Sequence, residues 1–246
     1  MKILSIVAIC LLLCSEALAM DTQRFVDGEP VIVRSDTAYV LARTNMFGTT
    51  WIGVRAFANP VLVRVLTTDE LSAATDQLQH DPHAKQESNV VVLYGRYSDT
   101  AKERIHLAAI KPGTYILAGL PWSTSMCMGT VRFEAKAGVI TDLGTILAAP
   151  DDTPTDVPEL AAHVRGKDLG SVPRPFVMGL RPYSADMEIP QALSNLPRVA
   201  ADYHAVGRFP NYFGTPIDRL APVPGIIDYD KDGDVLDLKD GGKILK

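Results

Sequence analysis

Four short apolar runs between residues 103 and 149 constrain the fold of this chain more than any other feature of its sequence. The runs are rich in β-branched and aromatic residues, and turn-forming residues separate them. Lys111-Pro112-Gly113 and Lys136-Ala137-Gly138 each place a glycine where a tight reversal needs a positive φ. Runs of this length between turns predict antiparallel strands that pair as hairpins. The expected strands are Ile105–Ile110, Thr114–Leu120, Thr130–Ala135 and Val139–Leu147.

The first half of the chain adds strand-like segments and one helix. Thr67 and Glu70 have the spacing of a capping box, in which the Thr hydroxyl and the Glu carboxylate each accept from a backbone amide at the helix start. This spacing predicts a short helix that runs to about Gln79 and ends at Asp81-Pro82. Residues 44–50 are expected to form a loop. The expected strands are Pro30–Arg34, Thr37–Arg43, Trp51–Phe57, Pro60–Leu66 and Asn89–Arg96.

The order of these elements indicates the fold class. About eight or nine short strands with one inserted helix fit a β-sandwich better than a parallel α/β sheet, because helices do not alternate with the strands. We therefore expect a mainly β protein, an antiparallel β-sandwich that spans residues 20–149.

The turns of this region resemble those of a known group of domains. Pro112-Gly113-Thr114-Tyr115, and the following pattern from Phe133 through Ala137-Gly138 to Ile140, are similar to turns of transthyretin-like or carboxypeptidase-regulatory-like sandwiches in uncharacterised bacterial cell-envelope proteins. The resemblance covers residues 103–147. It implies a β-sandwich and an extracytoplasmic setting, and it carries over no functional residue.

The composition changes after residue 149. Residues 150–246 are rich in proline, which keeps helices short, and they begin with a polar linker at 150–158. We expect an irregular, partly helical extension that packs on the sandwich. The expected helices are 158–165, 190–195 and 197–206, the first ended by Gly166.

The N-terminus has the pattern of a secretory signal peptide. Lys2 precedes an apolar run at Ile3–Leu13, and Ala17-Leu18-Ala19 has the small residues of a signal peptidase site. We expect cleavage after residue 19 and a mature protein that is periplasmic or secreted. The apolar run is too short to span a bilayer, and no later stretch approaches about 18 apolar residues, so no integral membrane span is expected.

Cysteine content and charge further limit the class of protein and its expected partners. Removal of residues 1–19 leaves only Cys127, so the mature chain has no internal disulfide and depends on its core for stability. The formal charge is −5, which argues against nonspecific binding to nucleic acid. The expected partner is an unidentified envelope protein or surface component.

The strongest chemical signal is an acidic run near the C-terminus. Asp228, Asp230 and Asp232 occupy the first, third and fifth positions of a calcium-loop pattern, and Gly233 occupies the sixth. The candidate Ca²⁺ ligands are Asp228, Asp230, Asp232, Asp234 and Asp237.

The rest of the run departs from an EF-hand. Lys239 stands where an EF-hand needs a bidentate glutamate, and proline and glycine flank the loop in place of helices. A non-EF calcium loop closed by Asp237 or Asp240 is one interpretation. A solvated acidic turn is the other.

Three other groups are poorer candidates for a site. His80 and His83 flank Pro82 with no further ligand nearby, and we interpret them as loop residues. Met126-Cys127-Met128 has soft ligands, but alternate side chains of an extended segment point to opposite faces, which favours a packing role. His106 lies between apolar residues and is expected in a sheet.

No recognised catalytic motif is present. The sequence lacks a Gly-x-Ser-x-Gly elbow, a His-Glu-x-x-His motif and a phosphate-binding glycine-rich loop. These observations favour an exported, non-catalytic envelope or interaction protein. The alternative is an extracytoplasmic, hydrolase-like enzyme whose site assembles only in space.

Overall fold

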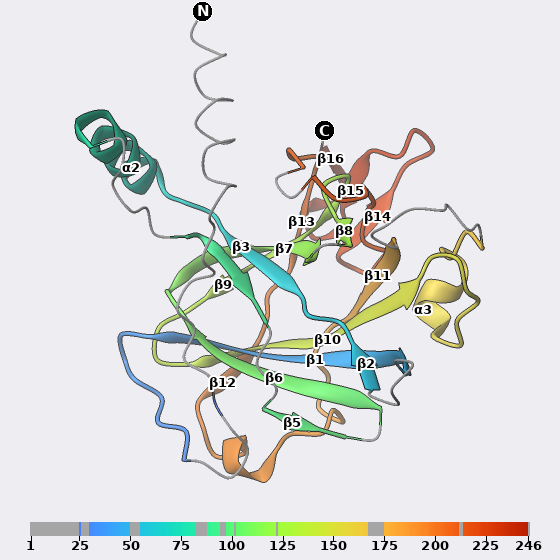
Figure 1. Cartoon of the computed structure of the whole chain (residues 1–246), viewed down its shortest axis with the longest axis horizontal. Coiled ribbons are helices and arrows are strands. Elements are labelled where there is room, and N and C mark those ends of the chain that lie inside the picture. The colour runs from blue at the N-terminus through green and yellow to red at the C-terminus, as the bar shows by residue number, and fades with distance from the viewer. Residues whose placement is uncertain are drawn as a thin grey trace, which may run out of the picture.

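The computed structural model describes residues 25, 30–49, 55–81, 88–93, 97–100, 102–121, 123–166, 175–211 and 214–245. The expected signal peptide lies outside the described residues. Two sheets pack face to face as a β-sandwich, and a third, small sheet lies at one end (Figure 1). The predicted mainly β sandwich is therefore confirmed.

One layer is a seven-stranded sheet. Its strands are β1 (Ala38–Thr49), β2 (Arg55–Phe57), β5 (Ser98–Asp99), β6 (Glu103–Ile110), β10 (Ile140–Pro150), β11 (Phe176–Arg181) and β12 (Arg198–Ala200). The order is β11-β10-β1-β6-β5, with β2 paired to the end of β1 and β12 paired to the start of β10. Most pairs are antiparallel, but β1 and β12 both run parallel to β10.

The second layer is a six-stranded antiparallel sheet. Its strands are β3 (Val61–Arg64), β4 (Val90–Val92), β7 (Gly113–Leu120), β8 (Thr124–Ser125), β9 (Thr130–Ala135) and β13 (His204–Val206). The order is β13-β9-β7-β3-β4, and β8 pairs with β7. The small third sheet contains β14 (Ile227–Tyr229), β15 (Val235–Asp237) and β16 (Lys243–Leu245).

The predicted hairpins at the two glycine turns were wrong: β6 and β7 lie in different sheets, and so do β9 and β10, because each of these turns carries the chain from one sheet to the other. Only β7 and β9 pair with each other as antiparallel neighbours. Lys111 and Pro112 connect β6 to β7, whose buried residues face the other sheet. The main core lies between the two sheets and contains an aromatic group of Tyr115, Phe133 and Tyr203, in which each neighbouring pair of rings is 5.8–6.0 Å apart between centroids. A second cluster covers the outer face of the seven-stranded sheet, where Phe25 and Leu193 pack on its strands.

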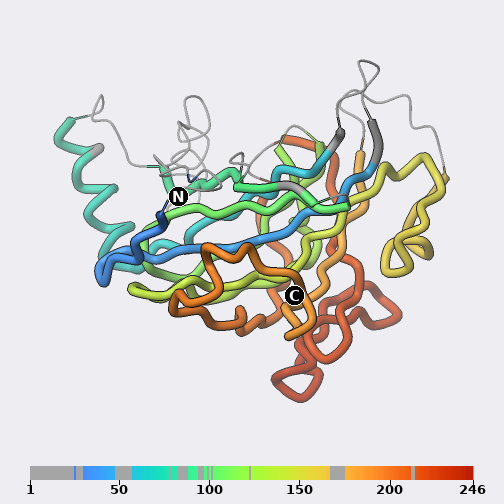
Figure 2. The backbone as a smooth tube through the Cα atoms, turned by 90° about the horizontal axis from the view of Figure 1, so that it is seen from below, coloured from blue at the N-terminus to red at the C-terminus, as the bar shows by residue number. Residues whose placement is uncertain are grey.

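The helices are short. α2 (Thr68–His80) has the predicted capping box, in which Thr67 and Glu70 each accept from the other's backbone amide. It stands out at one corner of the molecule in both views (Figures 1 and 2). α3 (Pro158–Ala161) is a single turn, and two 3₁₀ turns are η1 (Gln191–Leu193) and η2 (Leu238–Asp240). Within the described residues, no helix has both the length and the apolar character needed to cross a membrane.

Three further local predictions were wrong. β1 continues through most of the expected loop at 44–50, because the end of this strand pairs with β2 and β6. The expected helix at 197–206 is instead β12 and β13, since each half pairs with a sheet strand. Residues 30–34 are not a strand, although Val31 is buried. Long-range pairing overrides local propensity in the first two cases.

The two parallel pairs meet at a distortion in β10. The register of β1 against β10 shifts between Leu41 and Arg43, opposite Asp142 and Thr145. Gly144 lies in this shift with φ 74°. A Cβ atom at this position would lie 2.2 Å from the carbonyl oxygen of Arg181. The bulge therefore requires glycine, both for its φ and for the close approach of the chain after β11.

A buried ion pair occupies the outer face of the seven-stranded sheet beside this bulge. Arg43 Nη1 lies 2.8 Å from Asp142 Oδ1. Both side chains are buried, with exposed fractions of 1% and 0%. The Arg43 guanidinium also donates from Nε and Nη2 to the carbonyl oxygen of Glu188, at 3.1 and 2.9 Å. The Gly144 amide donates to Asp142 Oδ1 at 3.0 Å. The pair thus joins β1, β10 and the segment before β12.

Candidate functional site

A shallow groove with a volume of about 360 Å³ lies at one side of the sandwich. One wall is β9, and the other is the segment that leads from β12 to β13. This segment, in orange, runs along the outside of the two sheets in Figure 2. The groove residues used below are Arg132, Glu134, Lys136, Val199, Asp202 and His204.

The groove forms because consecutive strands belong to different sheets. β12 pairs with β10 in one sheet, and β13 pairs with β9 in the other. Tyr203 anchors the crossing between them: its ring is buried in the main core, and its hydroxyl donates to the carbonyl oxygen of Leu143 at 2.8 Å. Burial, together with the nearby charge of Asp142, raises the pKa of Tyr203 well above its ordinary value. The position of this wall is therefore set by a buried contact.

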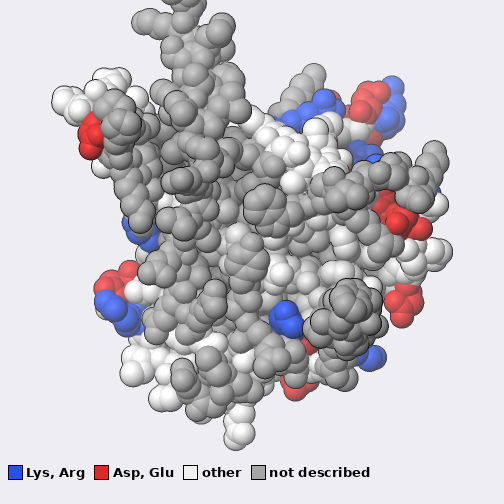
Figure 3. Space-filling view, viewed as in Figure 1, with Lys and Arg blue, Asp and Glu red and all other residues white. Residues whose placement is uncertain are grey.

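The charges of the groove have both signs. Arg132 and Glu134 alternate with buried residues along β9, and Lys136 follows at the same spacing. Lys136 Nζ lies 3.8 Å from Glu134 Oε2. Arg132 has no ion-pair partner among the residues that the structure describes. On the face shown in Figure 3, the coloured Lys, Arg, Asp and Glu side chains are also interspersed.

His204 lies between two carboxylates at the end of the groove. Its Nε2 atom is 3.7 Å from Asp202 Oδ2, and its Nδ1 atom is 3.9 Å from Asp237 Oδ2. Asp202 also forms an ion pair with Lys239, and this hydrogen bond is the main reason that the pKa of Asp202 is lowered. No described hydroxyl or thiol lies within hydrogen-bonding distance of His204. Among the described residues, the arrangement presents no activated nucleophile.

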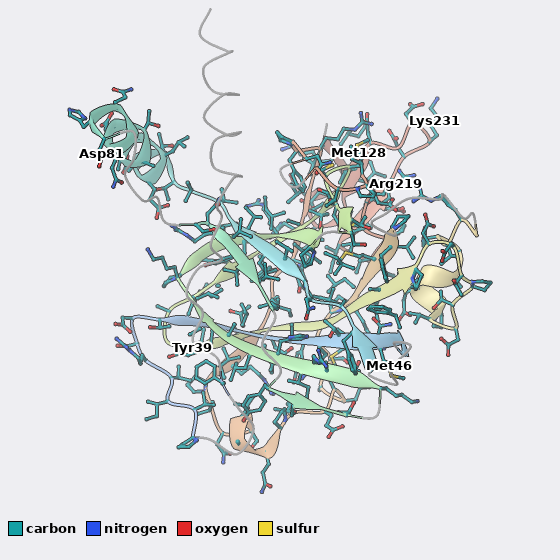
Figure 4. All side chains as sticks on the ribbon, viewed as in Figure 1. Tyr39, Met46, Asp81, Met128, Arg219 and Lys231 are labelled. Carbon is teal, nitrogen blue, oxygen red and sulfur yellow. The ribbon has the colours of Figure 1, made fainter. Side chains whose placement is uncertain are left out.

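The acidic run forms the turn between β14 and β15. Asp230 Oδ1 accepts from the amides of Asp232 and Asp234, each at 2.9 Å. Gly233 has φ 81° and donates to the carbonyl oxygen of Asp230 at 3.0 Å. Lys231 marks the tip of this turn in Figure 4. One carboxylate therefore closes the turn by accepting from its backbone, as short Asp side chains commonly do.

The other predicted calcium ligands face different partners. Asp228 accepts from the amide of Tyr229, Asp234 pairs with Arg208 at 3.3 Å, and Asp237 accepts from the amide of Lys239. Asp232 is exposed. Within the described part of the chain, no three His, Cys, Asp or Glu side chains are grouped so that they could hold a metal ion. Calcium binding by this loop stays a prediction.

Substitutions at Asp230 distinguish its two possible roles, which are to bind Ca²⁺ and to accept hydrogen bonds from the turn amides. If its carboxylate mainly accepts from the turn amides, Asp230→Asn keeps one acceptor and leaves the free energy of unfolding nearly unchanged. Asp230→Ala removes the acceptor, and we expect a loss of about 0.5–2 kcal/mol, as for a helix cap. Chemical denaturation of both variants measures this difference.

A calcium titration to several millimolar completes the experiment, because weak extracellular sites bind at about 10⁻⁴ to 10⁻³ M. If the loop binds Ca²⁺, the wild-type melting temperature rises with Ca²⁺, and both variants lose that rise. A flat titration together with a stable Asp230→Asn variant would identify the loop as an acidic turn.

The remaining candidates lie in structural settings. His106 is a buried residue of β6, and its Nε2 lies 3.0 Å from the hydroxyl oxygen of Thr44. His80 is exposed at the end of α2, while His83 lies outside the described residues. Met126 and Cys127 are buried, and Met126 belongs to the main core. Their positions agree with packing roles.

Sequence reasoning did not identify the groove. Asp202 and His204 were placed on an expected helix, and Asp237 was considered only as a calcium ligand. The exposed and buried alternation of Arg132 to Lys136 was the one available signal, because it marks the outer face of β9. Comparisons with protein-family models, with curated proteins and with solved structures gave no match.

Proposed function

We propose that the protein is an exported, non-catalytic binding module of the cell envelope and that the groove beside β9 is its ligand site. The observation that carries the proposal is the groove itself: two segments far apart in the sequence enclose it, and its second wall is held by the buried Tyr203. Clefts that are formed by a rigid framework are the usual places for ligands.

The chemistry of the groove supports binding more than catalysis. Its charged side chains belong to ion pairs or face solvent, and among the described residues neither ring nitrogen of His204 contacts a group that it could activate. The signal-peptide pattern of residues 1–19 and the resemblance of residues 103–147 to envelope sandwiches support an extracytoplasmic location. The same features fit an envelope protein or a surface component as the partner.

A hydrolase-like enzyme is the competing function, and one observation favours it. His204 lies between Asp202 and Asp237, and a carboxylate beside a histidine can orient it as a general base. In that case His204→Gln would abolish turnover of a substrate. In the binding module, the same substitution changes only the affinity of the groove.

One preparation tests the proposal. The full chain is produced in a bacterium with a Sec pathway, and the periplasmic fraction is expected to contain a protein whose mass corresponds to residues 20–246. This protein is then used to select ligands from a display library of short linear peptides, with an Arg132→Glu/Lys136→Glu variant for counter-selection. We expect ligands that bind the wild type in preference to the variant. Retention of residues 1–19, or a selection that yields no groove ligand, would contradict the proposal.

A further inference from the structure

The charged side chains of the groove project from the outer face of the six-stranded sheet. Arg132 lies opposite His204 of β13, and Glu134 lies opposite Thr114 of β7. Phe133, which stands between them in β9, packs in the main core. Because successive side chains of a strand point to opposite faces, Arg132 and Glu134 share the outer face. Both side chains are exposed and line the groove.

The backbone of β9 is already paired at both ends of the groove. At one end, His204 pairs with Arg132. At the other end, Ala137 follows β9 and bridges to Ala38 at the start of β1, and the Gly138 amide donates to the carbonyl oxygen of Thr37. A ligand that fits the groove as it stands therefore contacts side chains rather than an open sheet edge.

The charges of these side chains nearly cancel. On β9, Glu134 and Lys136 form a loose, exposed pair that solvent screens. Arg132 keeps its charge without an ion-pair partner among the described residues. On the other wall, Asp202 is exposed and pairs with Lys239. A ligand with a single charge meets a side chain of its own sign beside each one of opposite sign, so the groove disfavours simple anions and simple cations alike.

The spacing of the charges shows which ligand would fit. Arg132 and Glu134 are two residues apart, and such residues lie about 6–7 Å apart along a strand. A ligand with two opposite charges at a similar separation can meet both side chains at once. Val199 lies on the opposite wall and is 45% exposed. It offers an apolar contact to the part of the ligand between the two charges.

From this arrangement we infer that the groove binds a small zwitterion. Its carboxylate lies at the guanidinium of Arg132, its ammonium group lies at the carboxylate of Glu134, and its spacer lies along Val199. A guanidinium can bind a carboxylate through two parallel hydrogen bonds, which sets the direction of the ligand. Terminal amino acids with a methylene spacer and dipeptides share this chemistry. The inference rests on the proposed function and specifies the class of its ligand.

Four small molecules test the need for both charges and for their separation. The mature protein is titrated with 5-aminopentanoate, pentanoate, pentylamine and glycine, and the amide chemical shifts of β9 and β13 are followed by NMR. We expect 5-aminopentanoate to bind about two- to fivefold more tightly than pentanoate or pentylamine, because an exposed charge pair contributes modestly. Glycine has the same two charges side by side, and it should bind more weakly than 5-aminopentanoate.

Neutral variants assign each charge of the ligand to one side chain. Arg132→Gln should weaken binding of 5-aminopentanoate by about two- to fivefold and leave pentylamine unaffected. Glu134→Gln should weaken 5-aminopentanoate and pentylamine but not pentanoate. Lys231→Gln makes the same change in charge as Arg132→Gln at an exposed turn outside the groove, and it should bind like the wild type. Unchanged melting temperatures show that the variants are folded.

Several results would overturn the inference. These are equal binding of 5-aminopentanoate and its two singly charged analogues, shifts that map outside the groove, and an equal loss in Arg132→Gln and Lys231→Gln. The absence of any binding at tens of millimolar would overturn it as well. A parallel titration with the dipeptide Ala-Ala identifies the source of the zwitterion: tighter binding than that of 5-aminopentanoate indicates a peptide, and weaker binding indicates an amino acid.

The outcomes distinguish this inference from the proposed function. If the peptide library yields groove ligands but no zwitterion binds, the groove is a binding site for another class of ligand. If the library yields no groove ligand, the proposed function itself is wrong.

Discussion

Replacement of Gly144 by alanine is expected to destabilise the protein by about 2–5 kcal/mol. The positive φ of 74° contributes about 1–2 kcal/mol of strain in a residue with a side chain. The new Cβ atom would also lie 2.2 Å from the Arg181 carbonyl oxygen and 2.6 Å from the Tyr183 amide nitrogen. Both are backbone atoms, so relief requires movement of the chain after β11, and such overpacking costs about 1–3 kcal/mol. Chemical denaturation measures the total.

Gly166→Ala is the matched control for this substitution. Gly166 has a similar φ of 67°, but no atom lies within 4 Å of its added Cβ. We expect only the conformational cost of about 1–2 kcal/mol. In a domain of this size each kcal/mol lowers the melting temperature by about 2–4 °C, so the two variants should be separable. Equal losses in both would show that the contact with β11 relaxes freely.

The second large effect concerns the buried ion pair. Removal of Asp142 by Asp142→Ala leaves Arg43 without a counter-charge in the interior and should cost about 3–5 kcal/mol. Arg43→Met should cost less, because Arg198 Nε still lies 3.9 Å from Asp142 Oδ2. Arg43 would lose its contact at 2.8 Å while its remaining acceptor is the Glu188 carbonyl oxygen. For Asp142→Ala, the amide of Gly144 also loses its acceptor. Unfolding free energies from urea titrations test this expectation.

The double variant Arg43→Met/Asp142→Leu provides the informative comparison. Since it removes both charges, its loss should be clearly smaller than the sum of the two single losses. The exposed pair of Arg34 and Asp36, with Nη2 and Oδ2 2.9 Å apart, serves as the surface control. Asp36→Asn should leave the melting temperature unchanged, because solvent screens such pairs. Additive losses in the buried pair would mean that each residue acts alone.

The parts of the fold that local sequence encodes were predictable. The strands β6 and β7 have their apolar runs and the turn residues between them in one short stretch, and α2 has both members of its capping box. The pairing of β6 with β7 was not predictable from that stretch, because the two strands belong to different sheets. The extension of β1 to Thr49 and the strand state of His204–Val206 were not predictable in this way. These segments pair with partners distant in sequence, and nothing in their own residues marks those partners.

The candidate site was even less predictable from local sequence than the strand pairing. The acidic run was visible in sequence because its spacing is regular, yet the structure distributes Asp230, Asp234 and Asp237 among different partners. The groove instead depends on Tyr203, which carries the chain from one sheet to the other. A crossing between sheets has no local pattern, so its position could be obtained only from the three-dimensional arrangement.

The parallel pairing of β1 with β10 bears on how the chain folds after synthesis. Tyr39 aligns with Ile140, and β10 also carries the partners of β11 and β12, so one strand late in the sequence completes most of the seven-stranded sheet. Such distant pairing makes folding slow, because a long loop must close before the contacts form. A ribosome-bound chain that lacks residues 140–150 cannot assemble this sheet. The seven-stranded sheet is therefore completed only after more than half of the chain has been synthesised.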